Sequence, residues 1–323
     1  MKLTNEEVLN VIKTSPVPDE IIIPVITWKY LLRSVLRGKN ILILGHSGIG
    51  KTVTAMALKT QFPKRPFEKF NLGATQEPRS FLIGNTHYDP AKGTFFGESL
   101  FVKMIQVPNA IILLDELSRA HPEAWNILMT VLDEKQRYLR IDERPDTPTI
   151  KVADGVSFVS TANIGGEYTS TRVLDRALKD RFTIIQMVPL TKDEEVKYLT
   201  KLFPDVDIKM INNIAEIADH TRQEIVSDQS KLDTMLSTRS TIELTSLLND
   251  GFTLAEAVEV SVYPLFSAAG GTASPQSYMR KYIQQYLPTD LDNTDNPVTT
   301  EEDDEDDDLQ TNKVPWKQNK PVV

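Results

Sequence analysis

The residues from Gly45 to Thr52 have the types and the spacing of a phosphate-binding loop. Gly45 is followed by four residues and then by Gly50, Lys51 and Thr52. Glycines let backbone N–H groups close around phosphate oxygens, and a helix start adds the positive end of its dipole. We expect Lys51 to reach the outer phosphates of a nucleotide and the Thr52 hydroxyl to bind magnesium. The loop predicted to hold the phosphates comprises Gly45, His46, Ser47, Gly48, Ile49, Gly50, Lys51 and Thr52.

Two adjacent carboxylates, Asp115 and Glu116, follow the apolar run from Ala110 to Leu114. Ligands of parallel sheets bind beside the carboxyl ends of the strands, where the phosphate loop also lies. We expect Asp115 to hold magnesium through water and Glu116 to orient and polarise the attacking water. Together with the phosphate loop, the pair predicts hydrolysis of a nucleotide.

The elements that must position these side chains alternate along the chain. Apolar runs at 40–44, 110–114, 156–160 and 183–188 predict strands buried on both faces. Good helix formers fill 51–61, and Pro122 opens a helix that runs to about Asp133. This alternation predicts an α/β fold with a parallel sheet covered by helices on both sides. Residues 191–287 contain several helical stretches and no convincing strand, which predicts a small all-helical domain.

Composition excludes several classes of protein. The chain has 323 residues, of which 40% are hydrophobic and 25% charged, as in globular proteins. It has no cysteine, which excludes disulfides, zinc–thiolate sites and cysteine nucleophiles. The apolar runs are too short to span a membrane, and the start lacks the apolar middle of a signal peptide. We therefore expect a cytoplasmic protein.

Negative charge is concentrated in the last part of the sequence. The stretch from Pro288 to Asp308 contains 11 acidic residues and no Lys or Arg, and eight of the acids are consecutive. Residues 1–287 alone carry a net charge of −1, so no global positive charge indicates nucleic-acid binding, although a local basic patch is compatible with it. We expect 288–323 to be a disordered acidic tail. Two roles are open for it, a solubilising segment and an electrostatic docking or autoinhibitory arm that imitates nucleic acid.

The motifs within residues 17–287 resemble those of AAA+ ATPases. They most resemble the clade of MoxR-type, NorQ/CbbQ-type and dynein-related ATPases, which also contains the ATPase subunit of cobaltochelatase. The stretch from Gly84 to Phe182 favours the cobaltochelatase (CobS-like) branch. The markers, besides the phosphate loop, are Leu114-Asp-Glu-Leu-Ser-Arg-Ala120, Ser160-Thr-Ala-Asn163, Tyr168-Thr-Ser-Thr171, Ala177-Leu-Lys-Asp-Arg181-Phe182 and Ser237-Thr-Arg239.

The resemblance implies a role for four further residues. Asn163 would help to position the attacking water, as the first sensor of the family does. Arg181 would be the arginine finger that enters the nucleotide site of the next subunit, with Arg176 as a second candidate. Arg239 would be the second sensor, which reads phosphate from the lid side. Arg119 matches a marker of the clade, but its residue type and spacing predict no role.

Two insertions resemble segments that face the pore or the client in ring ATPases. The first, 85–98, contains Phe95 and Phe96, which we consider either client contacts or packing residues. The second, 136–152, resembles the hairpin before the first sensor. The four histidines, His46, His87, His121 and His220, share no ligand-like spacing, so the only metal we expect is magnesium carried with the nucleotide.

These features predict a subunit of an ATP-hydrolysing ring. The domains would be an AAA+ α/β domain at 1–190, a helical lid at 191–287 and the tail at 288–323. The subunit would form a homo-oligomer, in this family a hexamer, and remodel a client protein, for example to insert a metal or cofactor. A von Willebrand factor A-domain adaptor is a further partner that the resemblance implies. The alternatives are a nucleotide-gated interaction module with little hydrolysis and a DNA-remodelling motor.

Overall fold

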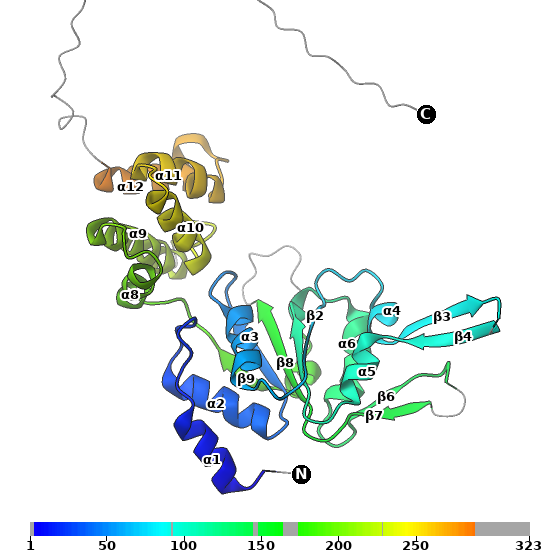
Figure 1. The fold of residues 1–323 in the computed structure, drawn as a ribbon. Helices are drawn as coiled ribbons and strands as arrows, with labels where there is room; N and C mark the ends of the chain where they lie inside the picture. Colours follow the sequence, from blue (N-terminus) through cyan, green and yellow to red (C-terminus); the bar gives the residue numbers. More distant parts are fainter. Residues whose placement is uncertain (1–2, 92, 145–147, 164–173, 228, 288–323) are drawn as a thin grey trace, which may run out of the picture. The chain divides into compact units, whose positions relative to one another are not determined.

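A sheet of five parallel strands forms the centre of the computed structural model, which describes residues 3–91, 93–144, 148–163, 174–227 and 229–287. The strands lie in the order β2-β5-β8-β1-β9, and every pairing between them is parallel (Figure 1). Their bounds are β1 (Ile41–Gly45), β2 (Phe67–Asn71), β5 (Ile111–Asp115), β8 (Ser157–Asn163) and β9 (Thr183–Gln186).

Alternate residues of each central strand point to opposite faces of the sheet, and both faces are buried. In β5, Ile111 and Leu113 belong to one hydrophobic cluster, whereas Ile112 and Leu114 belong to another. All of these side chains are fully buried. Burial on both faces explains why the strands are continuously apolar in the sequence.

Helices cover each face of the sheet (Figure 1). On one face lie α2 (Val25–Leu36) and α3 (Lys51–Gln61), which contribute Trp28 and Leu58 to their cluster. The other cluster contains Phe101 and Leu128, from the helices on the opposite face, α4 (Pro78–Leu82), α5 (Leu100–Ile105) and α6 (Pro122–Leu132). The predicted parallel sheet with helices on both sides is therefore confirmed.

Two antiparallel hairpins interrupt this alternation. The first is formed by β3 (Gly84–Asp89) and β4 (Gly93–Glu98), and it covers the insertion predicted at 85–98. The second is formed by β6 (Tyr138–Arg140) and β7 (Thr149–Lys151), within 136–152. Figure 1 shows the two hairpins extending from the same side of the sheet. An ion pair of 2.6 Å between Arg144 and Glu98 joins them.

The described part of 191–287 contains helices and no strand. Polar side chains cap these helices, as where Thr191 and Glu194 form a capping box at the start of α8. The remaining helices of the chain are α1 (Asn5–Thr14), α7 (Arg176–Lys179), α8 (Lys192–Leu202), α9 (Ile208–Val226), α10 (Thr238–Asn249), α11 (Leu254–Ser261) and α12 (Pro275–Ile283), with short 3-10 turns at Leu117–Arg119, Tyr263–Leu265, Gly271–Ala273 and Gln284–Tyr286.

Met1–Tyr286 form one compact unit, as judged by the contacts between their residues. The boundary at residue 190 stays a prediction, as does the cytoplasmic location. The tail at 288–323, the Tyr168 motif and residues 145–147 of the second insertion lie outside the described residues. None of the helices in the described ranges is both long and apolar enough to cross a membrane.

Candidate nucleotide site

The phosphate loop lies between the end of β1 at Gly45 and the start of α3 at Lys51. Gly48 and Gly50 have φ values of 75° and 90°, a left-handed conformation that glycine adopts without steric cost. Space is also limited, because a Cβ on Gly48 would lie 2.4 Å from Ser237 Oγ. The glycines of the motif are therefore required by backbone conformation and by packing.

Lys51 is buried within the loop that it helps to form. Its Nζ donates hydrogen bonds to the carbonyl oxygens of Gly45 at 2.9 Å and His46 at 2.5 Å. Burial lowers the pKa of Lys51 to about 8, and the charge of Arg239 acts in the same direction, whereas Asp115 and Glu116 raise it. A nearby phosphate would favour the charged ammonium, since an opposite charge raises the pKa of a lysine.

Asp115 accepts three side-chain hydrogen bonds at the end of β5. Its Oδ1 accepts from the Thr52 hydroxyl at 2.9 Å and from the Thr161 hydroxyl at 2.5 Å, and its Oδ2 lies 2.7 Å from Lys69 Nζ. Burial raises the pKa of Asp115, but these donors outweigh burial and hold the pKa below its ordinary value. The carboxylate is thus ionised at neutral pH, as a magnesium site requires.

Glu116 follows with an unusual backbone conformation. Its φ of 58° and ψ of 40° place it in the left-handed region, which turns the chain directly after the strand. The backbone N–H of Glu116 donates to Thr161 Oγ1 at 3.1 Å, and its carboxylate lies 3.5 Å from the Arg119 guanidinium. A Cβ on Gly73 would come within 2.2 Å of Glu116 Oε2. Because Gly73 has no side chain, the Glu116 carboxylate has room at this position.

Asn163 ends β8, which lies between β5 and β1 in the sheet. In register it is paired with Gly45, the first residue of the phosphate loop. Its backbone N–H donates to Ser118 Oγ at 3.1 Å. The strand order therefore places Asn163 between the carboxylate pair and the phosphate loop.

Arg239 reaches the same region from α10. Its backbone N–H donates to the carbonyl of Gly48 at 3.3 Å, so the first turn of the helix contacts the phosphate loop directly. One cavity collects most of the predicted site. It is lined by Ser47, Gly48, Gly50, Lys51, Thr52, Val53, Glu116, Thr161, Ala162, Asn163 and Arg239.

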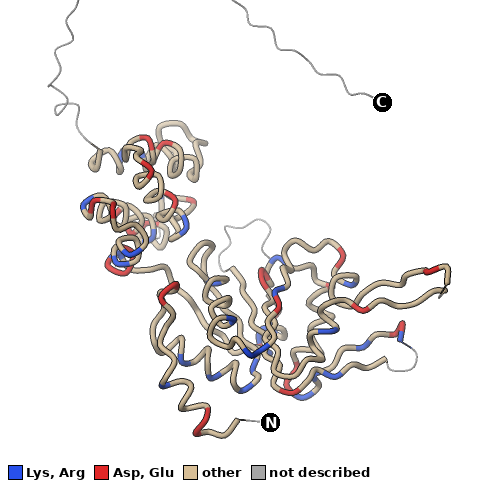
Figure 2. Tube along the Cα trace, viewed as in Figure 1, with Lys and Arg blue, Asp and Glu red and all other residues tan. Residues whose placement is uncertain are grey.

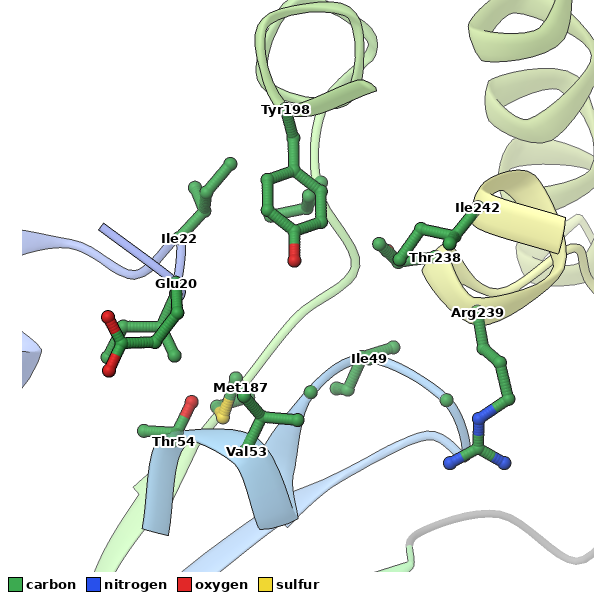
Figure 3. Close-up of a pocket in the computed structure, with 14 residues that line it drawn as sticks. Glu20, Ile22, Ile49, Val53, Thr54, Met187, Tyr198, Thr238, Arg239 and Ile242 are labelled. Atoms are coloured by element: carbon green, nitrogen blue, oxygen red, sulfur yellow. The ribbon is translucent and has the colours of Figure 1, made fainter. Parts of the chain in front are cut away.

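A second, more apolar pocket adjoins this cavity, and the motifs had not indicated it. Figure 3 shows the Tyr198 side chain pointing into the pocket, with Ile22 on one side and Ile242 on the other. The two cavities share Gly48, Gly50, Val53 and Arg239. The apolar side chains of the second pocket suit the flat face of a nucleobase. Ile21 and Ile22 line it together with the phosphate loop and with segments distant in the sequence, so no single motif pointed to it.

The two candidate arginine fingers lie outside both cavities. Arg181 is held by its own chain, since its Nε donates to the Met129 carbonyl at 2.8 Å and its guanidinium lies 3.5 Å from Asp133. Arg176, the first residue of α7, is exposed and has no side-chain partner among the described residues. Neither arginine reaches the nucleotide site of its own subunit.

The histidines and the aromatic residues of the first insertion differ in their contacts. His121 caps α6 by accepting from the Glu123 backbone N–H at 3.3 Å, and His220 stacks on Tyr282 with ring centroids 3.6 Å apart. Phe96 packs against the core, which contradicts a role as a client contact, whereas Phe95 is 45% exposed. Within the described ranges, no cluster of three or more His, Asp or Glu side chains could hold a metal ion.

Comparison with known proteins identifies the family. A parallel sheet with a glycine-rich loop after β1 and a carboxylate pair after β5 is the architecture of a P-loop nucleotide-binding protein. A family model described as "AAA domain (dynein-related subfamily)" matches residues 40–182. "Putative chaperone BssE" of Thauera aromatica is 32% identical over 227 residues, which cover 69% of this chain and 74% of that protein. The chain therefore belongs to the dynein-related subfamily of AAA domain proteins, an AAA+ ATPase family.

Other similarities are shorter or concern the fold alone. "Uncharacterized protein YojN" of Bacillus subtilis strain 168 is 32% identical over 163 residues, which span 50% of this chain and 51% of that protein. A mutant form of RuvB from Thermotoga maritima has a similar structure, with a TM-score of 0.50 and 15% identity. The similarity covers 75% of this chain and 71% of RuvB, and supports the AAA+ fold assignment.

Proposed function

We propose that this chain is a subunit of an AAA+ ring that couples hydrolysis of Mg-ATP to the remodelling of a partner protein. The observation that carries the proposal is the single cavity that gathers Lys51, Thr52, Glu116, Asn163 and Arg239. These side chains come from the start of α3, the residue directly after β5, the end of β8 and the first turn of α10. A binding loop alone would need neither the carboxylate nor the asparagine.

The side chains of the cavity and of Asp115 fit magnesium and a nucleoside triphosphate. The Thr52 hydroxyl donates a hydrogen bond to Asp115, so the lone pairs of its oxygen stay available for a cation. Thr52 would contact the metal directly, and Asp115 would hold it through water. Magnesium, when bound, neutralises charge on the phosphate groups.

The residues of this chain then divide the work. Lys51 and the loop N–H groups bind the phosphates, and Arg239 contacts them from α10. Glu116 accepts a hydrogen bond from the attacking water and polarises it, while the Asn163 amide fixes the position of that water. The apolar pocket around Tyr198 receives the base.

Hydrolysis requires a second subunit in this proposal. Neither Arg176 nor Arg181 lines the cavities of its own chain, so each would act on the site of a neighbour. Such an arginine offsets the charge that builds on the transferred phosphate, an effect of about 10³–10⁵ in rate. In a closed homohexameric ring, every nucleotide site would receive an arginine from the neighbouring subunit.

The remodelling role rests on the relatives and on the hairpins. BssE is named as a chaperone, which supports a protein client. Tyr88, 74% exposed, and Phe95 extend along the β3–β4 hairpin, where we place client contacts. We further propose that the chain belongs with the MoxR and cobaltochelatase-type motors. It would then work with a von Willebrand factor A-domain adaptor in inserting a metal or cofactor.

The first experiment measures the ATPase rate per subunit over a wide range of protein concentrations. A rate that climbs steeply and then levels off supports a site built between subunits. The control is Glu116→Gln, which should bind ATP as tightly as the wild type yet hydrolyse it at least about 10²-fold more slowly. Measurable wild-type hydrolysis that Glu116→Gln leaves unchanged contradicts the proposed chemistry.

Two other functions are outcomes of the same tests. ATP binding and assembly without hydrolysis at any concentration, even with candidate clients, would indicate a nucleotide-gated interaction module. Salt-sensitive binding to DNA would indicate a DNA-remodelling motor. Figure 2 shows Lys and Arg interspersed with Asp and Glu along the described chain, which favours a protein client over DNA.

A further inference from the structure

Lys69 makes an ion pair inside the proposed magnesium site. It lies on β2, the edge strand next to β5, and its Nζ is 2.7 Å from Asp115 Oδ2. We propose that Lys69 is a built-in competitor of magnesium, whose ammonium sets the concentration of free Mg²⁺ needed to load nucleotide. This inference rests on the proposed function, because it concerns the metal that accompanies ATP.

The hydrogen bonds of Asp115 leave one oxygen for a cation. Oδ1 already accepts from the hydroxyls of Thr52 and Thr161. Oδ2 is therefore the oxygen that remains for a metal-bound water, and Lys69 holds it. The ammonium donates hydrogen bonds and accepts none, so it takes one of the two acceptor positions of Oδ2 and leaves a single one for a metal-bound water.

Charge adds to this competition. The Asp115 side chain is only 7% exposed, so its interaction with a cation is weakly screened. An ammonium in contact with the carboxylate cancels much of the attraction that the carboxylate offers to Mg²⁺. Metal binding must therefore displace Lys69 or act against its charge.

The surroundings of Lys69 allow it to move away. Its side chain is 39% exposed and leads from an edge strand. A cavity beside it is lined by Lys69, Asn71, Thr75 and Glu77, among others. The ammonium can thus turn toward solvent or toward the Glu77 carboxylate without disturbing the core. An ion pair whose lysine is this exposed contributes little to the stability of the fold, so stability alone does not explain Lys69.

The test is a magnesium titration of nucleotide binding with the full chain. A fluorescent ADP analogue is held at a fixed concentration, MgCl₂ is varied at constant ionic strength, and the Mg²⁺ midpoint of the binding signal is recorded. The variants are Lys69→Met and Lys69→Gln, which remove the charge, and Lys69→Arg, which keeps it. Lys64→Met is the matched control, because Lys64 is an exposed lysine in the loop that precedes the same strand.

We expect Lys69→Met and Lys69→Gln to lower the Mg²⁺ midpoint about three- to tenfold, while binding in excess Mg²⁺ is unchanged. Lys69→Arg and Lys64→Met should keep the midpoint within twofold of the wild type. A midpoint that both uncharged variants leave unchanged overturns the inference. So does weaker ADP binding in excess Mg²⁺, which would make Lys69 a phosphate ligand. A wild type that binds no nucleotide at any Mg²⁺ concentration overturns the proposed function itself, and the inference with it.

Discussion

Thr52 and Asp115, 63 positions apart, are joined by a hydrogen bond of 2.9 Å from Thr52 Oγ1 to Asp115 Oδ1. The bond links the start of α3 to the end of β5, although β8 lies between β5 and β1 in the sheet. Thr161 of β8 bridges the gap, since it donates to the same carboxylate oxygen and accepts from the Glu116 backbone. Three elements thus hold the carboxylate pair against the phosphate loop before any ligand arrives.

Replacing Thr52 with valine tests this arrangement. Valine keeps the shape of the side chain but removes the hydroxyl, so Asp115 retains Thr161 and Lys69 while the metal loses a ligand. We expect the ATPase rate to fall at least about tenfold, with the free energy of unfolding changed by only about 1 kcal/mol. The measurements are steady-state hydrolysis and urea denaturation. Thr60→Val, an exposed change on the same helix, should behave as the wild type. A Thr52→Val variant of normal activity would remove Thr52 from the proposed metal site.

The parts of the site that the sequence predicted follow from a local motif and from the general arrangement of parallel sheets. A glycine-rich loop fixes its own shape, and parallel strands bring their carboxyl ends to one edge, so Lys51, Asp115 and Asn163 had to meet. The edge strand β2 was not predicted, because Glu68 and Lys69 interrupt its apolar pattern. Edge strands bury less surface and therefore carry a weaker signal.

The apolar pocket and the Lys69 ion pair depend on contacts between distant segments. Ile22, Tyr198 and Ile242 come from three parts of the chain, and no local pattern relates them. The contacts of Arg181 were likewise invisible in the sequence. A helix-end arginine has the same local pattern whether it faces a neighbour or bonds to Met129 of its own chain.

The two candidate fingers can be separated by measuring activity and stability together. Arg176→Ala should lower the ATPase rate about 10³-fold or more if Arg176 is the finger, without changing stability, because this side chain is exposed. Arg181→Ala should lower stability by about 1–3 kcal/mol, since it removes the guanidinium that donates to the Met129 carbonyl and pairs with the Asp133 carboxylate.

Mixing experiments then test whether the finger acts between subunits. Inactive Lys51→Ala subunits should regain activity when mixed with inactive Arg176→Ala subunits, because one mixed interface would carry both an intact loop and an intact finger. Lys179→Ala is the control for a charge change on the same helix. Full activity of Arg176→Ala alone would leave Arg181 as the candidate.

Nucleotide affinity should depend on pH through Lys51. Its pKa of about 8 in the unliganded protein is below its ordinary 10.5, because the side chain is buried. The folded state thus binds fewer protons than the unfolded state between about pH 8 and 10.5, so the unfavourable contribution of Lys51 to stability is complete below 8 and declines as pH rises through this window.

Phosphate binding requires the charged form, so the effect on affinity has the opposite sign. ADP affinity should be constant below about pH 7.5 and fall by up to about tenfold per pH unit above 8. The measurement is fluorescence titration of an ADP analogue from pH 6.5 to 9.5 in excess magnesium. The phosphates of the nucleotide are fully ionised over the upper part of this range and add no slope there. An affinity that stays constant up to pH 9.5 would contradict the lowered pKa.

A buried ion pair behind Arg239 should control both stability and nucleotide binding. Glu195 of α8 is fully buried and accepts from Arg222 of α9 at 2.8 Å, and it also accepts from the Thr241 hydroxyl of α10. Arg222 in turn donates to the carbonyl of Leu236, just before α10 begins. This network fixes the first turn of α10, from which Arg239 contacts the phosphate loop.

Arg222→Met leaves the Glu195 carboxylate buried without its charge partner, which should cost about 3–5 kcal/mol in the free energy of unfolding. The double variant Glu195→Leu/Arg222→Met should recover much of that loss, because two apolar side chains can replace a buried pair. If the network positions Arg239, the double variant should still bind ADP about tenfold more weakly than the wild type. Urea denaturation and ADP titration of both variants decide the matter. A double variant that regains stability and full affinity would limit the pair to a structural role.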